Sequence, residues 1–284
     1  MFTTANTRTE PRRALLAAAA AAALVLTPLQ ATAAGTTPAD ALAAAAMSPA
    51  RPASETARDR YRHPVETLRF FGVKPTDTVV EIWPAPGYYA EILAPYLKDH
   101  GHYIAAGFVT GLFVSPSRNR AMRAFAARFA DQSRYGRIEI TELGPAGHWQ
   151  PAAAGSADLV LSFRNVHNWI AADDQQKMFD AFYGALKPGG VLGLVEHRGW
   201  PGETVAEMAE SGYVPVDYVK QLAAKAGFRF VAEAEINANP KDGHHYPKGV
   251  WTLPPTLALG DQDRAKYLAI GESDRMTLKF VKPR

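Results

Sequence analysis

Hydrophobic positions along the chain alternate between short apolar runs and helical patterns. Short runs typical of strands covered on both faces lie at 78–83, 102–108, 137–143, 158–163, 191–196, 228–236 and 276–281. Apolar residues at three- and four-residue spacing predict helices at 61–71, 88–98, 118–129, 175–186 and 217–226. Strands that alternate with helices predict a mostly parallel sheet covered by helices on both faces. No convincing crossover helix joins the last two strands, so we expect the last strand to be antiparallel.

The first 33 residues have the three parts of an export signal. Arg8, Arg12 and Arg13 precede an alanine- and leucine-rich run, and Ala31-Thr32-Ala33 offers a cleavage site. The run is shorter than the roughly 20 residues that a membrane span requires. We therefore expect cleavage near Ala33, a periplasmic protein, and no stable membrane span in its mature form. The arginine pair is typical of the twin-arginine route, and the general secretory route is the alternative.

Composition divides the remaining chain into two parts. Residues 34–57 are rich in Ala, Pro, Ser and Thr and predict a flexible arm, whereas residues 58–284 have the composition of one globular domain. The chain has no cysteine, which excludes disulfides and thiolate metal sites. Its formal charge of +3 falls to about +1 without residues 1–33, because they hold three arginines and one glutamate. A nearly neutral domain gives no electrostatic argument for a nucleic-acid partner.

Two motifs at strand boundaries resemble those of S-adenosylmethionine-dependent methyltransferases. After the first strand, residues 81–87 (Glu-Ile-Trp-Pro-Ala-Pro-Gly) resemble the loop of an acidic residue and alternating glycines. Residues 186–190 (Leu-Lys-Pro-Gly-Gly) match the turn that ends a helix and begins a buried strand. Residues 58–284 as a whole resemble a family of predicted, often exported, methyltransferases. The matching stretches are 61–64, 70–72, 80–84, 163–169, 195–198, 235–240 and 271–276.

The resemblance implies an α/β protein with the Rossmann-like class I methyltransferase fold. This fold has a seven-stranded, mostly parallel sheet, helices on both faces and an antiparallel last strand. The implied cofactor is S-adenosyl-L-methionine and the implied partner is a small-molecule substrate. The expected cofactor-binding residues are Glu81, Pro84, Gly87, Tyr88, Gly107 and Asn165.

The chain departs from the general pattern of S-adenosylmethionine-dependent methyltransferases at two places near the expected cofactor. Trp83 and Ala85 occupy positions where glycines would let the backbone approach a ligand closely. The second strand ends at residues 105–108 (Ala-Ala-Gly-Phe) without the acid that often binds the ribose. Both departures predict weak cofactor binding.

Polar residues follow the fourth, fifth and sixth strands, whose carboxyl ends meet at one edge of such a sheet. We expect His167, His197 and Glu196 to be catalytic, since imidazole titrates near neutral pH and a carboxylate can orient it. His167, in a predicted loop after the fourth strand, is the preferred base. The expected substrate-binding residues are His63, Asn168, Trp169, Arg198, Asn237 and Asn239. For any single residue, a helix cap or a strand-end hydrogen bond is the competing interpretation.

Three alternatives stay open at this point. His167, His197 and Glu196 have metal-ligating atoms, but without H-x-x-x-H or H-E-x-x-H spacing we predict no metal. Residues 239–259, rich in proline around Trp251, predict either a lid or a packed surface loop. The function is either methyl transfer to a small molecule in the periplasm or ligand binding without catalysis on a degenerate methyltransferase scaffold. A nicotinamide-dependent oxidoreductase is disfavoured because G-x-G-x-x-G is absent. The sequence predicts neither the acceptor nor the oligomeric state.

Overall fold

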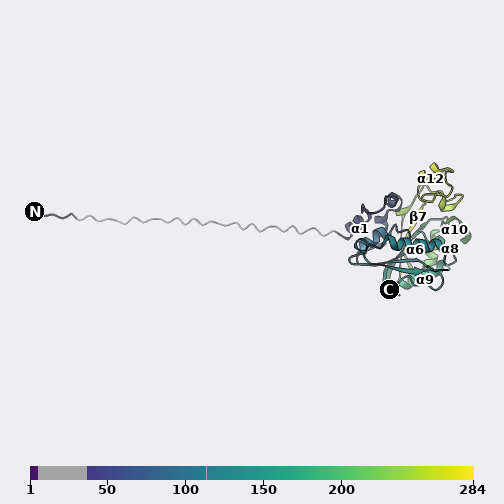
Figure 1. The fold of residues 1–284 in the computed structure, drawn as a ribbon, viewed down its shortest axis with the longest axis horizontal. Helices are drawn as coiled ribbons and strands as arrows, with labels where there is room; N and C mark the ends of the chain where they lie inside the picture. The colour runs from purple at the N-terminus through teal and green to yellow at the C-terminus, as the bar shows by residue number, and fades with distance from the viewer. Residues whose placement is uncertain (6–36, 113) are drawn as a thin grey trace. The chain divides into compact units, whose positions relative to one another are not determined.

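The structure is a computed structural model that describes residues 1–5, 37–112 and 114–284. The chain divides into two units, Met1–Gly35 and Thr36–Arg284, and Figure 1 shows the elements of the second. Residues 1–5 form no helix or strand. The rest of the predicted signal peptide, its cleavage site and residues 34–36 of the predicted arm lie outside the described residues. Within the described ranges, no helix is both long enough and apolar enough to cross a bilayer.

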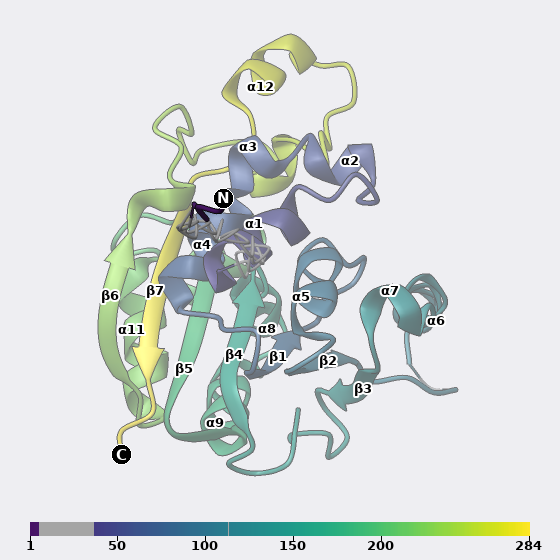
Figure 2. The same ribbon diagram turned by 90° about the vertical axis from the view of Figure 1, so that its left-hand side faces the viewer.

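Seven strands form one mixed sheet in the order β3-β2-β1-β4-β5-β7-β6. They are β1 (Thr78–Ile82), β2 (His102–Phe108), β3 (Ile138–Leu143), β4 (Ala157–Phe163), β5 (Leu186–His197), β6 (Arg229–Ala234) and β7 (Arg275–Val281). The neighbours from β3 to β5 are parallel, whereas β7 runs antiparallel to both β5 and β6 (Figure 2). The predicted seven-stranded sheet with an antiparallel last strand is confirmed.

Side chains of successive strand residues enter two hydrophobic layers on opposite faces of the sheet. In β1, Val79 belongs to one layer, whereas Val80 and Ile82 belong to the other. The first layer includes side chains from α1 (Pro38–Ala46), α4 (Pro64–Phe71), α5 (Ala90–Leu97), α6 (Pro116–Arg128) and α7 (Gln132–Tyr135). The second includes side chains from α8 (Val166–Ala171), α9 (Gln175–Ala185), α10 (Val205–Ser211) and α11 (Val216–Lys225). The predicted covering of both faces is therefore confirmed.

Residues 37–57, which composition predicts to be part of a flexible arm, are helical and packed in the structure. Leu42 and Ala46 of α1 are 1% and 3% exposed and lie in the same hydrophobic cluster as Ile92 of α5. A second short helix, α2 (Ala53–Thr56), follows. Composition misleads here because alanine is the strongest helix former. An alanine-rich segment can therefore be a helix that docks through a single buried leucine.

Three further differences from the predicted elements affect the carboxyl edge of the sheet. The predicted helix 61–71 is divided into α3 (Asp59–Arg62) and α4, because His63 between them has a left-handed φ of 38°. The polar segment after β4 is the helix α8 instead of a loop. The long segment before β7 contains three short helices, η1 (Glu235–Asn237), η2 (Gly249–Thr252) and α12 (Arg264–Ile270). Figure 2 shows α2, α3 and α12 beyond the carboxyl ends of the parallel strands.

Candidate functional site

A cavity of about 590 Å³ lies at the carboxyl ends of β1 and β4. These strands are neighbours in the sheet but not in the chain, so the cavity is at the point where the strand order reverses. Open α/β sheets bind their ligands at this point, and the volume suits a small molecule. We call this cavity the crevice. Its lining residues are Ser54, Glu55, Arg58, Arg62, Glu81, Ile82, Trp83, Pro84, Ala85, Pro86, Tyr88, Tyr89, Phe163, Arg164, Asn165 and Pro255.

Four of the six expected cofactor-binding residues line the crevice, namely Glu81, Pro84, Tyr88 and Asn165. The two glycines do not. Gly87 has a φ of 116°, and a Cβ there would lie 2.5 Å from the ring of Phe129. A Cβ on Gly107 would lie 2.1 Å from the Met122 side chain. Both glycines therefore allow side chains from α6 and its end to pack closely, and the structure gives them no direct place in the crevice.

Trp83, which stands at a position where the related loops have glycine, has its indole at the ends of three strands. Its Nε1 donates a hydrogen bond to the Leu143 carbonyl oxygen at 3.0 Å, and its ring centroid is 4.8 Å from that of Phe108. Phe108 ends β2 and Leu143 ends β3. The indole therefore fills space at the β1, β2 and β3 ends that a ligand would otherwise reach.

Glu81 is a buried acid at the inner wall of the crevice. Its carboxylate accepts a hydrogen bond from the Tyr103 hydroxyl at 2.7 Å. Burial raises the pKa of Glu81 to about 8, and the tyrosine hydrogen bond offsets only part of this effect. The side chain is therefore mostly neutral at pH 7 and able to donate a hydrogen bond.

Asn165 and Tyr88 are tied to the protein and also line the crevice. The Asn165 side-chain amide donates to the Ile82 carbonyl oxygen at 3.0 Å, which joins the end of β4 to the end of β1. The Tyr88 hydroxyl donates to the Asp59 carboxylate, and the Arg62 guanidinium lies 4.4 Å from the Tyr88 ring centroid. These contacts fix the positions of side chains that a ligand would touch.

The structure brings His167 and His197 together, as the sequence predicts, with ring centroids 5.3 Å apart. Glu196 lies between them. Its carboxylate accepts hydrogen bonds from the backbone N–H groups of Val166 and His197, and it contacts His167 Nδ1 at 3.1 Å. His197 Nδ1 pairs with the Ser273 hydroxyl. Each imidazole is thus oriented through Nδ1, which leaves Nε2 to face other groups.

The structure does not agree with the expectation that His167 is the more accessible of the two imidazoles. His167 lies in the first turn of α8, is 6% exposed, and its ring centroid is 5.8 Å from that of Trp251. His197 is more exposed. Burial lowers the pKa of His197 well below its usual range, and the nearby His167 and Arg164 lower it further. His197 is therefore unprotonated at pH 7 and the more exposed of the two imidazoles, so it is the more accessible proton acceptor.

The same three side chains have the atoms of a metal site. One ligand atom each from His167, Glu196 and His197 lie within 4.8 Å of one another. However, Glu196 already accepts three hydrogen bonds, and Arg164 and Arg275 place positive charge near His197. This field opposes a divalent cation. The geometry therefore favours a proton acceptor that is oriented by Glu196.

The expected substrate-binding residues are not brought together in the crevice. His63, Asn237 and Asn239 line a separate, smaller cavity of about 170 Å³ beside α3. The Asn237 amide donates to Thr67 and Thr277, and the Asn239 amide donates to backbone carbonyl oxygens at Ile270 and Glu272. These two asparagine side chains form hydrogen bonds within the fold, which agrees with the competing interpretation of strand-end hydrogen bonds.

The other three expected substrate-binding residues also have structural roles or face solvent. Trp169 is completely buried in the hydrophobic layer with α9, and Asn168 is exposed, because consecutive residues of a helix face different directions. Arg198 forms ion pairs with Glu235 and Asp274. The prediction for these positions assumed a loop, and α8 gives residues 168 and 169 different surroundings.

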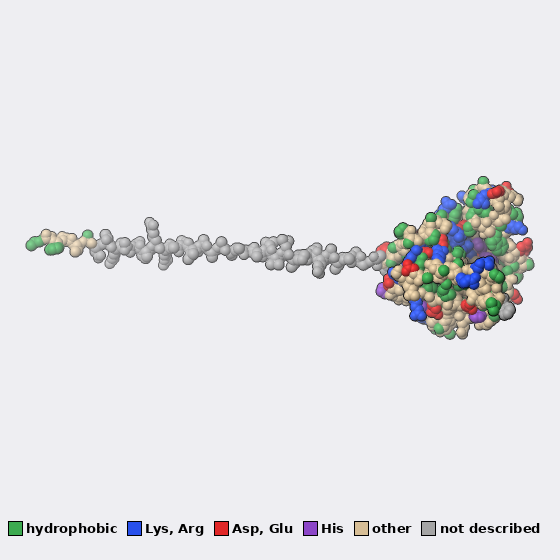
Figure 3. Space-filling view, viewed as in Figure 1, with side chains coloured by type: hydrophobic (Ala, Val, Ile, Leu, Met, Phe, Trp, Pro, Cys, Tyr) green, Lys and Arg blue, Asp and Glu red, His purple; other side chains and the backbone are tan. Residues whose placement is uncertain are grey.

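A cluster of arginines between the crevice and the smaller cavity was not predicted. Arg58 and Arg62 line the crevice, whereas Arg275 and Glu272 line the smaller cavity. Arg58, Arg62 and Arg275 all form ion pairs with the single carboxylate of Glu272. Arg164, directly after β4, lines the crevice. We call Arg58, Arg62, Arg164 and Arg275 with Glu272 the arginine cluster. The available signal was an arginine immediately after an apolar strand, together with arginines four residues apart at 58 and 62. In Figure 3, Lys and Arg side chains gather near the α12 segment.

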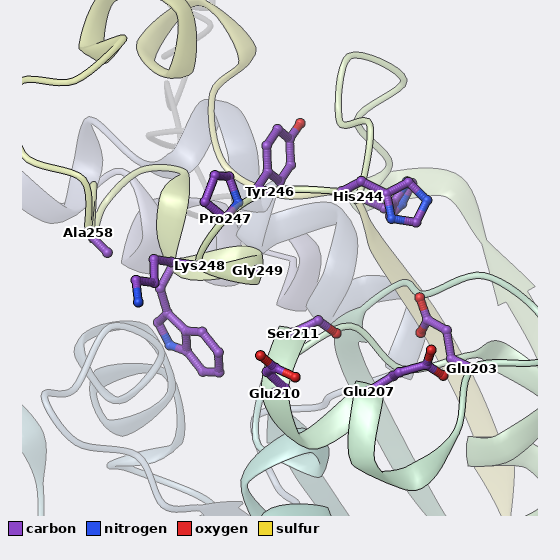
Figure 4. A pocket seen from close by; sticks show the side chains of 12 residues that line it. Glu203, Glu207, Glu210, Ser211, His244, Tyr246, Pro247, Lys248, Gly249 and Ala258 are labelled. Atoms are coloured by element: carbon purple, nitrogen blue, oxygen red, sulfur yellow. The ribbon is translucent and has the colours of Figure 1, made fainter.

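A third cavity, of about 520 Å³, lies between α10 and residues 244–251. Figure 4 shows Glu203, Glu207 and Glu210 on one side of it and His244 and Lys248 on the other. Trp251 also lines this cavity and contacts the His167 ring, so its indole separates the cavity from the histidine pair. The segment predicted to be a lid or a packed loop is packed, since Leu253 is completely buried.

Comparisons with known proteins agree with this architecture. Residues 90–194, from α5 into β5, match the family described as "Methyltransferase domain". A SAM dependent methyltransferase from Aquifex aeolicus has a TM-score of 0.53 at 13% identity, covering 80% of this chain and 93% of that one. Phosphoethanolamine N-methyltransferase 2 from Haemonchus contortus, in complex with S-adenosyl-L-methionine, has a TM-score of 0.53 at 16% identity, covering 79% and 53%.

The cyclase SpnF is also similar, with a TM-score of 0.52 at 15% identity, covering 78% of this chain and 80% of that one. No protein with a curated description matches in sequence. The expected class I methyltransferase fold is thereby confirmed. Since a cyclase shares the fold, the reaction has to be argued from the site.

Proposed function

We propose that the protein is an S-adenosylmethionine-dependent methyltransferase that acts on a small molecule. The observation that carries this proposal is the crevice between the ends of β1 and β4, in a sheet of the class I methyltransferase order. The matching methyltransferase domain covers β2, β3, β4 and most of β5. Fold and domain support the class of reaction. The histidine pair does not line the crevice, but His197 lies near Arg164 at the crevice wall, which supports a proton acceptor there.

The cofactor is S-adenosyl-L-methionine, which supplies an electrophilic methyl group when bound. The matching methyltransferase domain and a neighbour solved with this molecule support it. The crevice residues fit part of this cofactor. Guanidinium groups of the arginine cluster suit its carboxylate, and the Asn165 amide and the neutral Glu81 carboxyl suit its polar groups. The indole of Trp83 leaves little room at the ends of β2 and β3, so an adenosine group there requires Trp83 to move.

The chain's own groups would position the acceptor and take up its proton. Methyl transfer depends mainly on alignment of the two reactants in a site from which water is excluded. Tyr89 and Phe163, whose rings stack with centroids 3.6 Å apart, give the crevice an apolar wall. His197 is neutral, oriented by Ser273, and near Arg164, which lines the crevice. It would accept the proton that the acceptor atom loses when that atom forms its bond to carbon.

The test of this proposal is mass analysis of the protein as purified, followed by incubation with the labelled cofactor and extracts of small molecules. Methyl transfer predicts a bound adenosyl ligand or transfer of the label to a small molecule. His197→Asn is expected to lower the turnover about 100-fold or more, since general base catalysis contributes at least this factor. Wild-type protein that binds the cofactor but transfers no label would contradict methyl transfer.

The proposal includes action outside the cytoplasm. Support comes from the arginines, the apolar run and the small residues of the predicted signal in residues 1–33. Because the cofactor is made in the cytoplasm, export of a folded protein with its ligand already bound would deliver only one equivalent. The compartment therefore decides whether the protein has enough cofactor for more than one catalytic cycle.

A second candidate function is ligand binding without methyl transfer, and the position of Trp83 favours it. Its indole fills space at the ends of three strands. Trp83→Gly separates the two functions, because it restores the residue usual in the related loops and removes this obstruction. A cofactor affinity that rises in the variant would show that the native loop restricts binding. An unchanged or lower affinity would show that the native loop already accepts the cofactor.

A further inference from the structure

The arginine cluster contains more positive charge than the protein around it neutralises. Three guanidiniums, those of Arg58, Arg62 and Arg275, share the single carboxylate of Glu272. The fourth, that of Arg164, lies near enough to feel their charges but has no ion pair of its own with any described residue. Burial by itself would raise the pKa of Glu272, but Arg275, Arg62 and Arg58 lower it to about 2. Glu272 is therefore fully ionised, and three positive charges remain in the cluster.

Other acids near the crevice do not neutralise this charge. Glu55 lines the crevice but forms an ion pair with Arg128. Asp59 forms an ion pair with Arg51. Glu81 is held mostly neutral by its burial.

Hydrogen-bond donors of the cluster lack partners. Arg62 is 2% exposed and lines the crevice, yet its Nη2 has no acceptor, and the same holds for Nη2 of Arg58. Within residues 37–112 and 114–284, the guanidinium of Arg164 has neither a hydrogen bond nor an ion pair. Buried donors of a charged group are costly when they lack acceptors. The unpartnered Nη2 atoms of Arg58 and Arg62 therefore indicate a site that an anion in the crevice would complete.

The cluster is also well placed for a ligand. Arg164 follows β4 with a left-handed φ of 63°, and its backbone N–H donates to the Val195 carbonyl oxygen at 2.7 Å. This conformation is uncommon for a non-glycine residue, and here it accompanies a side chain that lines the crevice. Burial lowers the pKa of Arg164 well below its usual range, and Arg62 and Arg275 lower it further. An anion beside it would remove this penalty.

We propose that the arginine cluster binds an oxyanion group, a carboxylate or a phosphate, on a ligand of the crevice. Guanidinium groups bind both by paired N–H···O hydrogen bonds. The oxyanion has two sources under the proposed function, the carboxylate of the cofactor or an acidic group on the acceptor. In the second case the substrate is a small organic acid or phosphate ester whose reacting atom lies toward His197. The site itself does not depend on methyl transfer.

The experiment measures binding to the full chain by calorimetry and thermal unfolding, with three probes. Inorganic phosphate, with sodium chloride at equal ionic strength as reference, reports the oxyanion site alone. S-adenosylmethionine and 5′-methylthioadenosine, which lacks the aminocarboxypropyl group and the sulfonium charge, report the cofactor with and without the part that carries its carboxylate. Arg164→Gln removes the unpaired guanidinium. Arg229→Gln is the matched control, because Arg229 is exposed at the start of β6, away from the carboxyl ends of the parallel strands.

The proposal predicts that Arg164→Gln weakens phosphate binding about tenfold or more, the value of a charge-assisted hydrogen bond. Arg229→Gln should leave it unchanged. Without phosphate, Arg164→Gln should unfold at the same temperature as the wild type or higher, because the charge repulsion of Arg164 by Arg62 and Arg275 is gone. If the variant fails to fold, Arg58→Gln at the more exposed edge of the cluster serves for the same measurement.

The paired probes identify the source of the oxyanion. If Arg164→Gln weakens S-adenosylmethionine but not 5′-methylthioadenosine, the cluster binds the cofactor's carboxylate. If both adenosyl compounds bind Arg164→Gln as tightly as the wild type, while phosphate binding is lost, the acidic group belongs to the acceptor. If phosphate binding depends on Arg164 and neither adenosyl compound binds, the oxyanion site stands and the proposed methyl transfer fails. Phosphate and S-adenosylmethionine affinities that are both independent of Arg164 would overturn the inference.

Discussion

At the scale of single residues, the site depends on charges that burial controls. Glu81 is kept neutral by the surrounding apolar atoms, and His197 is kept neutral by burial and by positive neighbours. Arginines that form ion pairs with Glu272 lie near them. This arrangement gives one small region a neutral acid, a neutral base and an anion-binding group, each with a separate chemical role.

Glu81 makes the stability of the protein depend on pH. Its pKa is about 8 in the folded chain and 4.5 as its ordinary value, so between these limits the folded state binds the proton that the unfolded state has lost. Stability from this group is present below pH 4.5 and is lost as the pH rises toward 8. We expect its contribution to fall by about 1.4 kcal/mol per pH unit in this window.

Urea unfolding of the wild type and Glu81→Gln at pH 5.5 and 7.5 checks this expectation. The free energy of unfolding of the variant should depend less on pH than that of the wild type. Glu66→Gln, on the exposed surface of α4, is the control and should follow the wild type. Equal pH dependence in all three proteins would show that Glu81 is ionised when buried.

His197 is expected to stay neutral well below pH 6.5, because burial and the charges of Arg164 and Arg275 disfavour its protonation. The folded pKa is lowered, so this group contributes stability above about pH 6.5 that is lost as the pH falls. Nitrogen NMR of labelled histidine between pH 5 and 8 measures the protonation state directly. An imidazole that titrates near 6.5 would refute the assignment of His197 as a desolvated base.

At the scale of elements, helices outside the predicted set decide the shape of the site. α1 packs against α5 through Leu42, although composition predicts a tether. α8 replaces a predicted loop and buries His167 and Trp169. α3 ends at His63 and contributes Arg62 to the crevice. Each of these helices is short, so its stability comes from packing and leaves a weak periodic signal.

Leu42→Ala tests whether α1 is part of the folded domain. Removing a fully buried leucine is expected to lower the free energy of unfolding by about 2–5 kcal/mol. Met47→Ala, at the exposed end of the same helix, should change it little, since Met47 is 73% exposed. Equal, small effects of both substitutions on denaturant unfolding would mean that residues 37–57 are the flexible arm that composition predicts.

The strands and long helices could be predicted because their patterns are set by burial. β2 begins and ends where the apolar run at 102–108 does. The Leu-Lys-Pro-Gly-Gly motif correctly predicts a strand after α9, but its five residues belong to β5 itself and form no separate turn. The site was predicted in part. The histidine pair with Glu196 was found because adjacent strands place their ends together. The arginine cluster was missed because it joins residues about 210 positions apart, such as Arg62 and Glu272, and no local pattern reports such a contact.

At the scale of the whole molecule, the predicted export signal and the implied cofactor point to different compartments. The proposed signal predicts a mature protein outside the cytoplasm, whereas the cofactor that the fold implies is made inside it. N-terminal sequencing of protein from cell fractions should give a start near Ala34 in the periplasmic fraction. Arg12→Lys with Arg13→Lys should block export if the twin-arginine route is used. An intact Met1 in the cytoplasmic fraction would contradict the export signal.

The central claim is that the crevice binds S-adenosylmethionine. Calorimetric titration of this cofactor into three proteins tests it most directly: the wild type, Ala85→Trp and Ala154→Trp. Ala85 lines the crevice, so a tryptophan there fills it, whereas Ala154 lines a different surface cavity beside α9. The account predicts weak binding, no tighter than micromolar, to the wild type and to Ala154→Trp, with none to Ala85→Trp. No binding to the wild type, or equal binding to all three proteins, would contradict it.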